Sequence, residues 1–132
     1  MSVGIVLVTH DDVGGALLRT AVSALDMCPL RVEVLSIRRG DAPEKMIEQA
    51  QALVESVADG DGVLVITDMY GSTPSNIASA LQKSVEVKSI AGLNLPMLIK
   101  IFNYPRSSLD ELIQKALEGG REGIMPCSTP NN

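Results

Sequence analysis

The sequence predicts an α/β fold, a doubly wound parallel sheet with strand order 2-1-3-4 and helices on both faces. Stretches that read as strands alternate with segments whose apolar residues recur at helical spacing, which is typical of this class. Two strands, Val3–Val8 and Gly62–Thr67, are almost continuously apolar, as expected for central strands covered on both faces. Two others, Arg31–Ile37 and Val85–Ala91, alternate polar and apolar residues, which favours sheet edges. Right-handed crossover connections then favour the order 2-1-3-4.

The opening strand leads directly into the first helix. The strand runs on to His10, and Asp11 and Asp12 are expected in the first turn of the helix, where the helix dipole favours acidic side chains. Gly14 follows in the same turn and allows the helix backbone to approach a neighbour closely.

The remaining helices are predicted from residues that favour helix ends. Asp41 with Glu44 three residues later predicts the start of a long amphipathic helix. The last helix is expected to stop at Gly119–Gly120, and Arg121–Met125 to form a short strand. Residues 126–132 are expected to be a flexible tail. The other N-terminal signals are Thr73 before Pro74, Asn94, and Ser107 with Asp110.

Composition predicts a single domain, taken as residues 1–125. The chain has 132 residues, 45% of them hydrophobic, which is enough for one aliphatic core. Aromatic residues make up 2% and the net charge is −5, so we expect no nucleic-acid partner. No apolar run approaches the ~20 residues that span a bilayer, and no basic segment opens a signal peptide. We therefore expect a cytoplasmic protein without direct membrane insertion, in which Cys28 and Cys127 are reduced.

Two of the predicted strands end at side chains that can act together. His10, the only histidine, ends the first strand, and Asp68 follows the third. In the predicted order these strands are neighbours, and the chain direction across the sheet reverses between them. Ligands bind outside the carboxyl ends of strands at such a point, so we expect His10 and Asp68 to lie together.

This pair suits phosphoryl transfer. A neutral imidazole is a nucleophile, and a carboxylate that accepts one ring N–H sets the tautomer and stabilises the developing charge. The turn Gly71-Ser72-Thr73, which enters a helix, offers N–H groups and hydroxyls to a phosphoryl group. The alternatives are a histidine satisfied by a backbone carbonyl and an Asp68 that only caps a turn. Arg38 and Arg39 are expected to be a solvated pair, with an anion contact as the alternative.

With these residues in view, the chain resembles the IIA component of the mannose-type (mannose/fructose/sorbose) phosphoenolpyruvate-dependent sugar phosphotransferase system. The resemblance covers nearly the whole length and rests on four segments taken together. They are Thr9-His10, Asp68-Met69-Tyr70-Gly71-Ser72-Thr73-Pro74, Ala91-Gly92-Leu93-Asn94-Leu95-Pro96-Met97-Leu98 and Gly120-Arg121-Glu122-Gly123.

The resemblance implies a phosphotransferase that carries phosphohistidine. His10 would accept a phosphoryl group from the histidine phosphocarrier protein HPr and pass it to a IIB component, and Asp68 would hydrogen-bond the imidazole. Gly71, Ser72 and Thr73 would line the phosphate pocket. The family pattern there is commonly Asp-x-x-Gly-Gly-Ser-Pro, so Ser72 replaces a glycine and Thr73 a serine. The family serves sugar transport and also regulatory phosphorelays, and the sequence does not choose between them.

The resemblance also bears on assembly and cofactors. Family members are cytoplasmic homodimers in which a C-terminal strand of one subunit, here Arg121–Met125, pairs with the sheet of the other. No metal or other cofactor is expected, because backbone amides and the helix dipole receive the phosphoryl group.

Two other functions compete with this one. In a receiver-like signalling domain, Asp11 and Asp12 would hold Mg²⁺ and Asp68 would accept the phosphoryl group. Against it, the fourth strand ends at Ile90-Ala91-Gly92 without a hydroxyl, and no fifth strand delivers a lysine. A non-catalytic small-ligand module could use the Gly71 loop, but G-x-G-x-x-G after the first strand and a P-loop lysine are both lacking.

Overall fold

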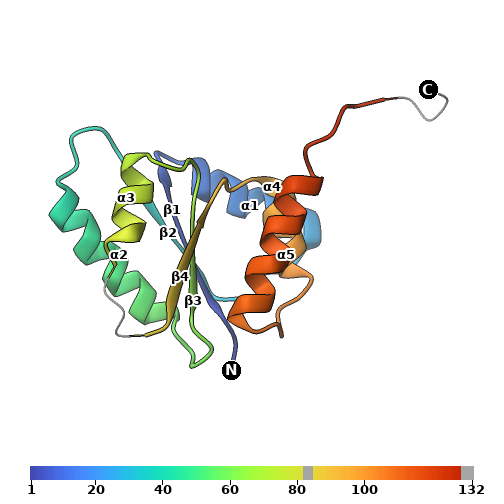
Figure 1. Cartoon of the computed structure of the whole chain (residues 1–132), viewed down its shortest axis with the longest axis horizontal. Helices are drawn as coiled ribbons and strands as arrows, with labels where there is room; N and C mark the ends of the chain where they lie inside the picture. Colours follow the sequence, from blue (N-terminus) through green and yellow to red (C-terminus); the bar gives the residue numbers. More distant parts are fainter. Residues whose placement is uncertain (82–84, 129–132) are drawn as a thin grey trace.

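The computed structural model describes residues 1–81 and 85–128 and contains one parallel sheet. Its strands lie in the order β2-β1-β3-β4, which confirms the predicted order (Figure 1). In the register, Val8 of the first strand lies opposite Thr67 of the third, so both strands end at the same edge of the sheet. The strands are β1 (Gly4–His10), β2 (Val32–Ile37), β3 (Val63–Thr67) and β4 (Val87–Ala91).

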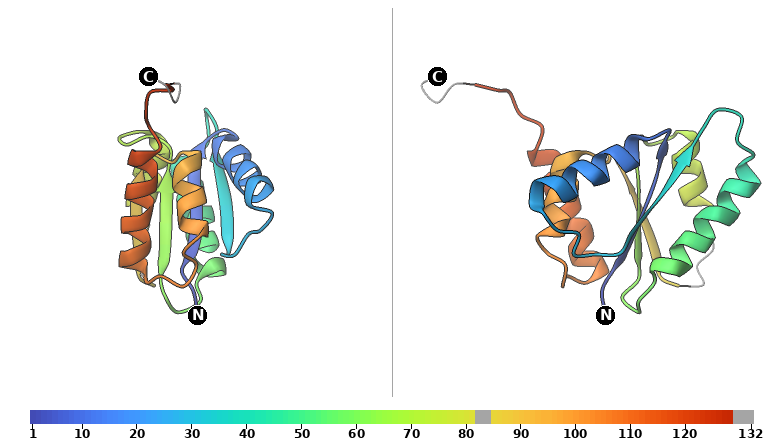
Figure 2. Two further views of the ribbon diagram at one scale, coloured as in Figure 1. Left: turned by 90° about the vertical axis from the view of Figure 1, so that its right-hand side faces the viewer. Right: turned by 180° about the vertical axis from the view of Figure 1, so that it is seen from behind.

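Helices cover both faces of the sheet. Two of them, α2 and α3, pack on one face, and α1, α4 and α5 pack on the other (Figures 1 and 2). Within the described residues no helix is long and apolar enough to cross a membrane. The helices are α1 (Val13–Leu25), α2 (Pro43–Val57), α3 (Thr73–Ser79), α4 (Leu95–Phe102) and α5 (Leu109–Glu122).

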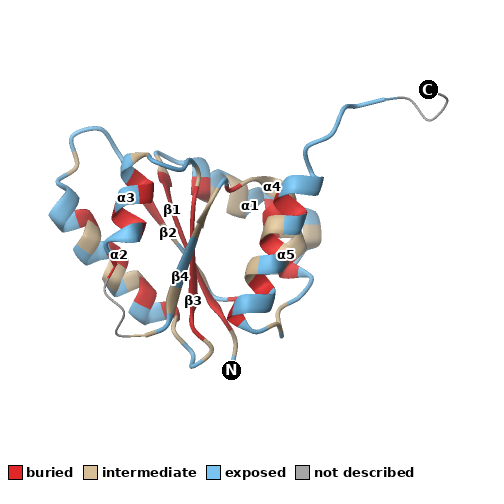
Figure 3. Ribbon diagram, in the orientation of Figure 1, coloured by how far each residue is buried: buried red, intermediate tan, exposed pale blue. Residues whose placement is uncertain are grey.

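The sheet separates two hydrophobic clusters. Along β1, Ile5 and Leu7 point into the cluster under α1, α4 and α5, while Val6 and Val8 point into the cluster under α2 and α3. Successive residues of a strand face opposite sides, and all four side chains are fully buried because helices cover both faces of the sheet. Figure 3 shows β1 as buried over most of its length. The alternating strands β2 and β4 are the edges and are only partly buried, as predicted.

The first two helices begin later than their acidic residues suggested. Asp11 lies before α1 with a positive φ of 41°, and Asp12 is the N-cap residue, so neither belongs to the first turn. Asp41 does not cap α2. Its Oδ2 accepts a hydrogen bond from the backbone N–H of Arg38 at 2.7 Å, and Ala42 is the N-cap residue instead. The carboxylate closes the turn after β2 and is no longer available to the helix.

The later helix starts agree with prediction to within one residue. Asn94 caps α4 as expected, since its Oδ1 accepts the Met97 N–H at 2.9 Å. The capping box of α5 is formed by Ser108 and Glu111, one residue beyond the predicted pair. Similarly, Ser72 and not Thr73 precedes α3.

The last helix does not stop at its glycine pair. Gly119 and Gly120 are buried inside α5, which continues to Glu122. A Cβ on Gly119 would lie 2.5 Å from the Cβ of Lys100 in α4, so this glycine allows the two helices to approach closely. The strand expected at Arg121–Met125 is placed too early: its first two residues are helical, and residues 124–128 have no regular secondary structure in the single chain. Residues 129–132 of the expected flexible tail lie outside the described residues.

Replacing Phe102, the only phenylalanine of the sequence, tests how α4 packs. Phe102 is fully buried in the cluster with α1 and α5, so Phe102→Ala is expected to cost about 3–5 kcal/mol of unfolding free energy, measured by urea denaturation. Tyr70→Ala, at an 87% exposed aromatic, is the control and is expected to change stability by less than about 0.5 kcal/mol. Equal losses in both variants would contradict the packing described here.

Candidate functional site

The two side chains predicted to act together lie side by side at one edge of the sheet. His10 is the last residue of β1, and Asp68 directly follows β3. Because these strands are parallel neighbours in register, the chain brings together residues that are 58 positions apart. This is the carboxyl edge of the sheet, where α/β proteins bind ligands.

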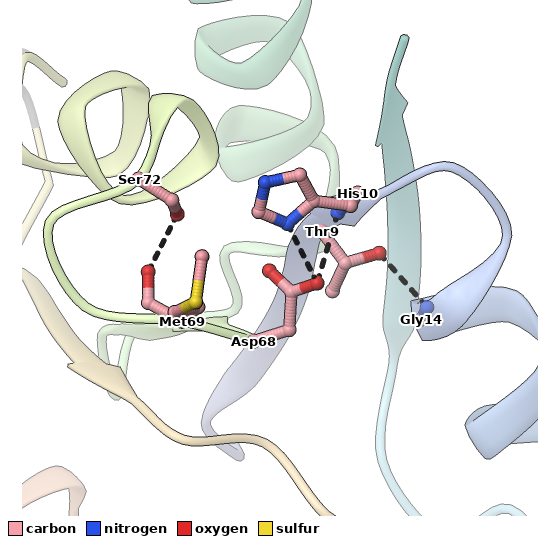
Figure 4. A network of polar contacts seen from close by, with 6 residues as sticks. All are labelled: Thr9, His10, Gly14, Asp68, Met69 and Ser72. Carbon is pink, nitrogen blue, oxygen red and sulfur yellow. Dashed lines mark hydrogen bonds and ion pairs between the residues drawn. The ribbon is translucent and has the colours of Figure 1, made fainter.

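One carboxylate oxygen of Asp68 contacts both the backbone N–H and the ring of His10. Asp68 Oδ2 accepts the backbone N–H of His10 at 3.1 Å and lies 2.9 Å from Nδ1 of the same residue (Figure 4). A carboxylate only accepts hydrogen bonds, so this contact requires the ring proton to be on Nδ1. The lone pair of the neutral ring is then on Nε2, on the side away from Asp68.

Exposure differs sharply within the pair. The side chain of His10 is 42% exposed, whereas that of Asp68 is 14% exposed. The ring is therefore open to a partner while its supporting carboxylate is shielded. The second oxygen of Asp68, Oδ1, is buried and has no hydrogen-bond partner among the described residues, and neither has the hydroxyl of Thr67 beside it. Unsatisfied buried polar atoms of this kind are uncommon and call for a functional explanation.

The end of β1 is anchored to the first helix. Thr9 is fully buried and its Oγ1 accepts the backbone N–H of Gly14 at 2.8 Å. A Cβ on Gly14 would lie 3.0 Å from this oxygen and 3.3 Å from the Cβ of Leu7, so the close approach predicted for this glycine is confirmed. The contact fixes the strand end from which His10 projects.

The turn after Asp68 leads into α3 beside the histidine. Gly71 adopts a φ of 80°, which favours glycine. The Ser72 hydroxyl donates to the Met69 carbonyl at 2.5 Å and so does not cap the helix. The first N–H groups of α3 therefore donate no hydrogen bond to the cap side chain. In Figure 4 the imidazole lies next to the Asp68 carboxylate and beside Ser72 of this turn.

A pocket of about 470 Å³ adjoins the imidazole. Of the three residues predicted to bind phosphate, Thr73 lines it together with His10, whereas Gly71 and Ser72 are not among its lining residues. Arg38 and Arg39 also line it, although the sequence analysis favoured a solvated pair. Their position after β2, at the same sheet edge as His10, is the signal that could have placed them here.

Two large apolar side chains stand exposed next to the site. Met69 is 57% exposed and Tyr70 is 87% exposed, both in the turn between Asp68 and α3. Exposed apolar side chains rimmed by polar groups are typical of protein-binding surfaces.

The acidic residues do not assemble as a receiver-like domain requires. In the described part of the chain, no three or more histidine, cysteine, aspartate or glutamate side chains are grouped so that they could hold a metal ion. Asp12 instead pairs with Arg19 at 2.8 Å, and this hydrogen-bonded guanidinium lowers the pKa of the Asp12 carboxyl. Among residues 1–81 and 85–128, no acidic triad therefore forms around Asp68.

Comparison with known proteins agrees with the fold and identifies the family. The family model of the PTS system fructose IIA component matches residues 4–117. The chain is 34% identical over 127 residues to the PTS system mannose-specific EIIAB component of Escherichia coli (strain K12), and equally to that of Shigella flexneri. The match covers 94% of this chain but 39% of each of these relatives.

Solved structures repeat the whole fold. A mannose/sorbose-specific IIA subunit from Enterococcus faecalis superposes with a TM-score of 0.86 at 21% identity, over 98% of both chains. The phosphotransferase system component EIIA from Streptococcus agalactiae gives a TM-score of 0.82 at 26% identity, over 94% of this chain and 96% of the other. Since the family model covers most of the sequence, the chain belongs to the mannose-type IIA components of the sugar phosphotransferase system.

Proposed function

We propose that the chain carries a phosphoryl group on His10, which it accepts from HPr and passes to a IIB component. The observation that carries the proposal is the contact of 2.9 Å between Nδ1 and Asp68, which leaves Nε2 of an accessible ring as the nucleophile. The name of the Escherichia coli relative, PTS system mannose-specific EIIAB component, supports a IIB component as the acceptor and a sugar phosphotransferase system as the setting.

The transfer step exchanges one N–P bond for another. The Nε2 lone pair of His10 forms a bond to phosphorus while the bond to the donor imidazole breaks, and that electron pair stays on the donor nitrogen. The His10 ring keeps its Nδ1 proton and gains positive charge, which the Asp68 carboxylate stabilises. Transfer to the IIB component repeats the exchange with His10 as the leaving group.

The transferred phosphoryl group would face the first turn of α3. Gly71 and Thr73 contribute backbone N–H groups there, and the helix dipole favours an anion at this end. Ser72 lies between them, but both its N–H, at 3.4 Å, and its hydroxyl donate to the Met69 carbonyl.

The assigned tautomer can be measured directly. With a single histidine in the chain, ¹⁵N-histidine labelling gives one set of ring signals. The neutral ring is expected to be protonated on Nδ1, and Asp68→Asn is expected to shift the proton toward Nε2, because an amide N–H can then face Nδ1. Asp12→Asn is the control and is expected to leave the signals unchanged. A wild-type ring protonated on Nε2 would refute the assigned nucleophile.

The carrier function is tested with labelled phosphoenolpyruvate, enzyme I and HPr in the absence of an acceptor. Label is expected on the wild-type chain and not on His10→Ala, because only Nε2 can accept the group. The product is expected to be stable in alkali and labile in acid, as a phosphohistidine is. Label that persists in His10→Ala, or that is removed by hydroxylamine, would instead indicate an acyl phosphate.

Asp68→Asn separates support of the ring from the ability to accept the group. This variant is expected to be labelled on the same histidine but at least about 100-fold more slowly, since the wrong tautomer is favoured. Labelling at the wild-type rate would remove Asp68 from the mechanism.

We further propose that the segment after Gly123 pairs with the sheet of a second copy. The edge strand β4 is only partly buried, and Ile124 and Met125 are 78% and 68% exposed in the single chain. Edge strands are ready templates for another strand. Replacing both residues with glutamate is expected to raise the dimer dissociation constant at least about 10-fold in sedimentation. Met27→Glu, at a 42% exposed methionine, is the control, and an unchanged dimer would reject this role.

A further inference from the structure

The pocket beside the imidazole has a cationic wall that the proposed transfer step does not use. Arg38 and Arg39 follow β2 immediately, at the sheet edge where His10 ends β1, and in the register His10 lies opposite Ile37. Both arginines are exposed, and both line the pocket together with His10 and Thr73.

Within the described part of the chain, neither guanidinium forms an ion pair with a carboxylate. Among the described residues, the ion pairs within 4.0 Å include Arg19 with Asp12 and Lys88 with Asp110, but none formed by Arg38 or Arg39. Asp41, the acidic residue closest in sequence to the two arginines, accepts a hydrogen bond from the backbone N–H of Arg38 with its carboxylate. Both positive charges are therefore free to receive an anion.

The local charge balance shows why an anion would need them. A phosphoryl dianion at Nε2 would approach a sheet edge rich in carboxylates, only one of which is neutralised by its own arginine. Arg38 contributes, after Arg19, to the lowered pKa of Asp12, so part of its field acts on that carboxylate. The carboxylates near the site are Asp11, Asp12, Asp41 and Asp68, and the guanidinium groups are Arg19, Arg38 and Arg39.

We propose that Arg39, assisted by Arg38, binds the phosphoryl group in transit at His10 from the side opposite the first turn of α3. The planar guanidinium presents paired N–H donors that match two phosphoryl oxygens, and it remains charged at every physiological pH. The phosphoryl group would then lie between backbone amides on one side and arginine on the other. This inference rests on the proposed carrier function and assigns that site a second set of anion contacts.

The test is the limiting rate of phosphoryl transfer from phosphorylated HPr at saturating concentration, measured by rapid quench. Arg39→Ala is expected to lower this rate about 10-fold and Arg38→Ala less, and the double alanine variant is expected to show about the product of the two effects, because each substitution removes a charge-assisted contact with the phosphoryl group. Arg39→Lys is expected to recover part of the loss, since it keeps the charge but not the paired donors.

The matched control is Arg31→Ala, which removes the same charge at the opposite end of β2. Arg31 is also exposed, and because it directly precedes β2 it lies where the strands begin, away from the strand ends that carry His10 and Asp68. This variant is expected to transfer at the wild-type rate. Since all three arginines are exposed, urea denaturation is expected to show equal stability for every variant.

A second readout does not need a carrier protein. Inorganic phosphate is titrated while the His10 ring signals are followed by NMR, and its dissociation constant is expected to rise several-fold in the double alanine variant but not in Arg31→Ala. Unchanged phosphate affinity together with an unchanged limiting rate would overturn the inference. A change confined to the concentration dependence of transfer would also overturn it, because it would place the arginines on the carrier protein and not on the phosphoryl group.

The failure of this inference can be told from failure of the carrier function. A wild-type chain that takes no label from phosphorylated HPr would refute the carrier function, and the inference would fall with it. A wild-type chain that is labelled on His10, with a double variant indistinguishable from Arg31→Ala, would refute the arginine contacts alone.

Discussion

The site depends on a single oxygen atom, Oδ2 of Asp68. This oxygen accepts a hydrogen bond from the backbone N–H of His10 and also contacts Nδ1 of the His10 ring. The backbone bond joins the end of β1 to the residue after β3, so it ties the position of the imidazole to the register of the two central strands. The ring contact then selects which nitrogen carries the proton. Because the carboxylate is mostly shielded from water, both bonds act in a medium where solvent competes weakly.

The architecture separates support from chemistry. The central strands β1 and β3 are buried on both faces by aliphatic side chains, which makes them a rigid platform whose single ionisable side chain is His10. The groups proposed to accept and bind the phosphoryl group lie at or just after the carboxyl ends of the strands. The ends of β1, β2 and β3 contribute His10, the arginine pair and Asp68 respectively, and the turn into α3 contributes amides. This division allows the loops to be varied without disturbing the core.

Several local signals predicted the right element at the wrong residue. Asp41 and Glu44 have the spacing of a helix cap. The carboxylate of Asp41 instead accepts the Arg38 N–H in the preceding turn, because backbone N–H groups of a turn and of a helix start compete for such a side chain. Gly119 and Gly120 have the composition of a helix stop, yet α4 packs so closely that a glycine is needed inside α5. In the first case a hydrogen bond within a turn, and in the second a contact between two helices, outweighed a preference that is worth about 1 kcal/mol.

The sequence by itself determined the class of fold, the strand order and the proximity of His10 to Asp68. These follow from the distribution of apolar residues along each strand, and burial on one or both faces is a property that a short segment carries within itself. Only the tertiary structure decided that Oδ2 faces Nδ1, that Nε2 is open, that Arg38 and Arg39 border the same pocket, and that α5 runs to Glu122. Such features depend on distances of a few ångströms between side chains of different elements, and those distances are set by how the helices pack on the sheet.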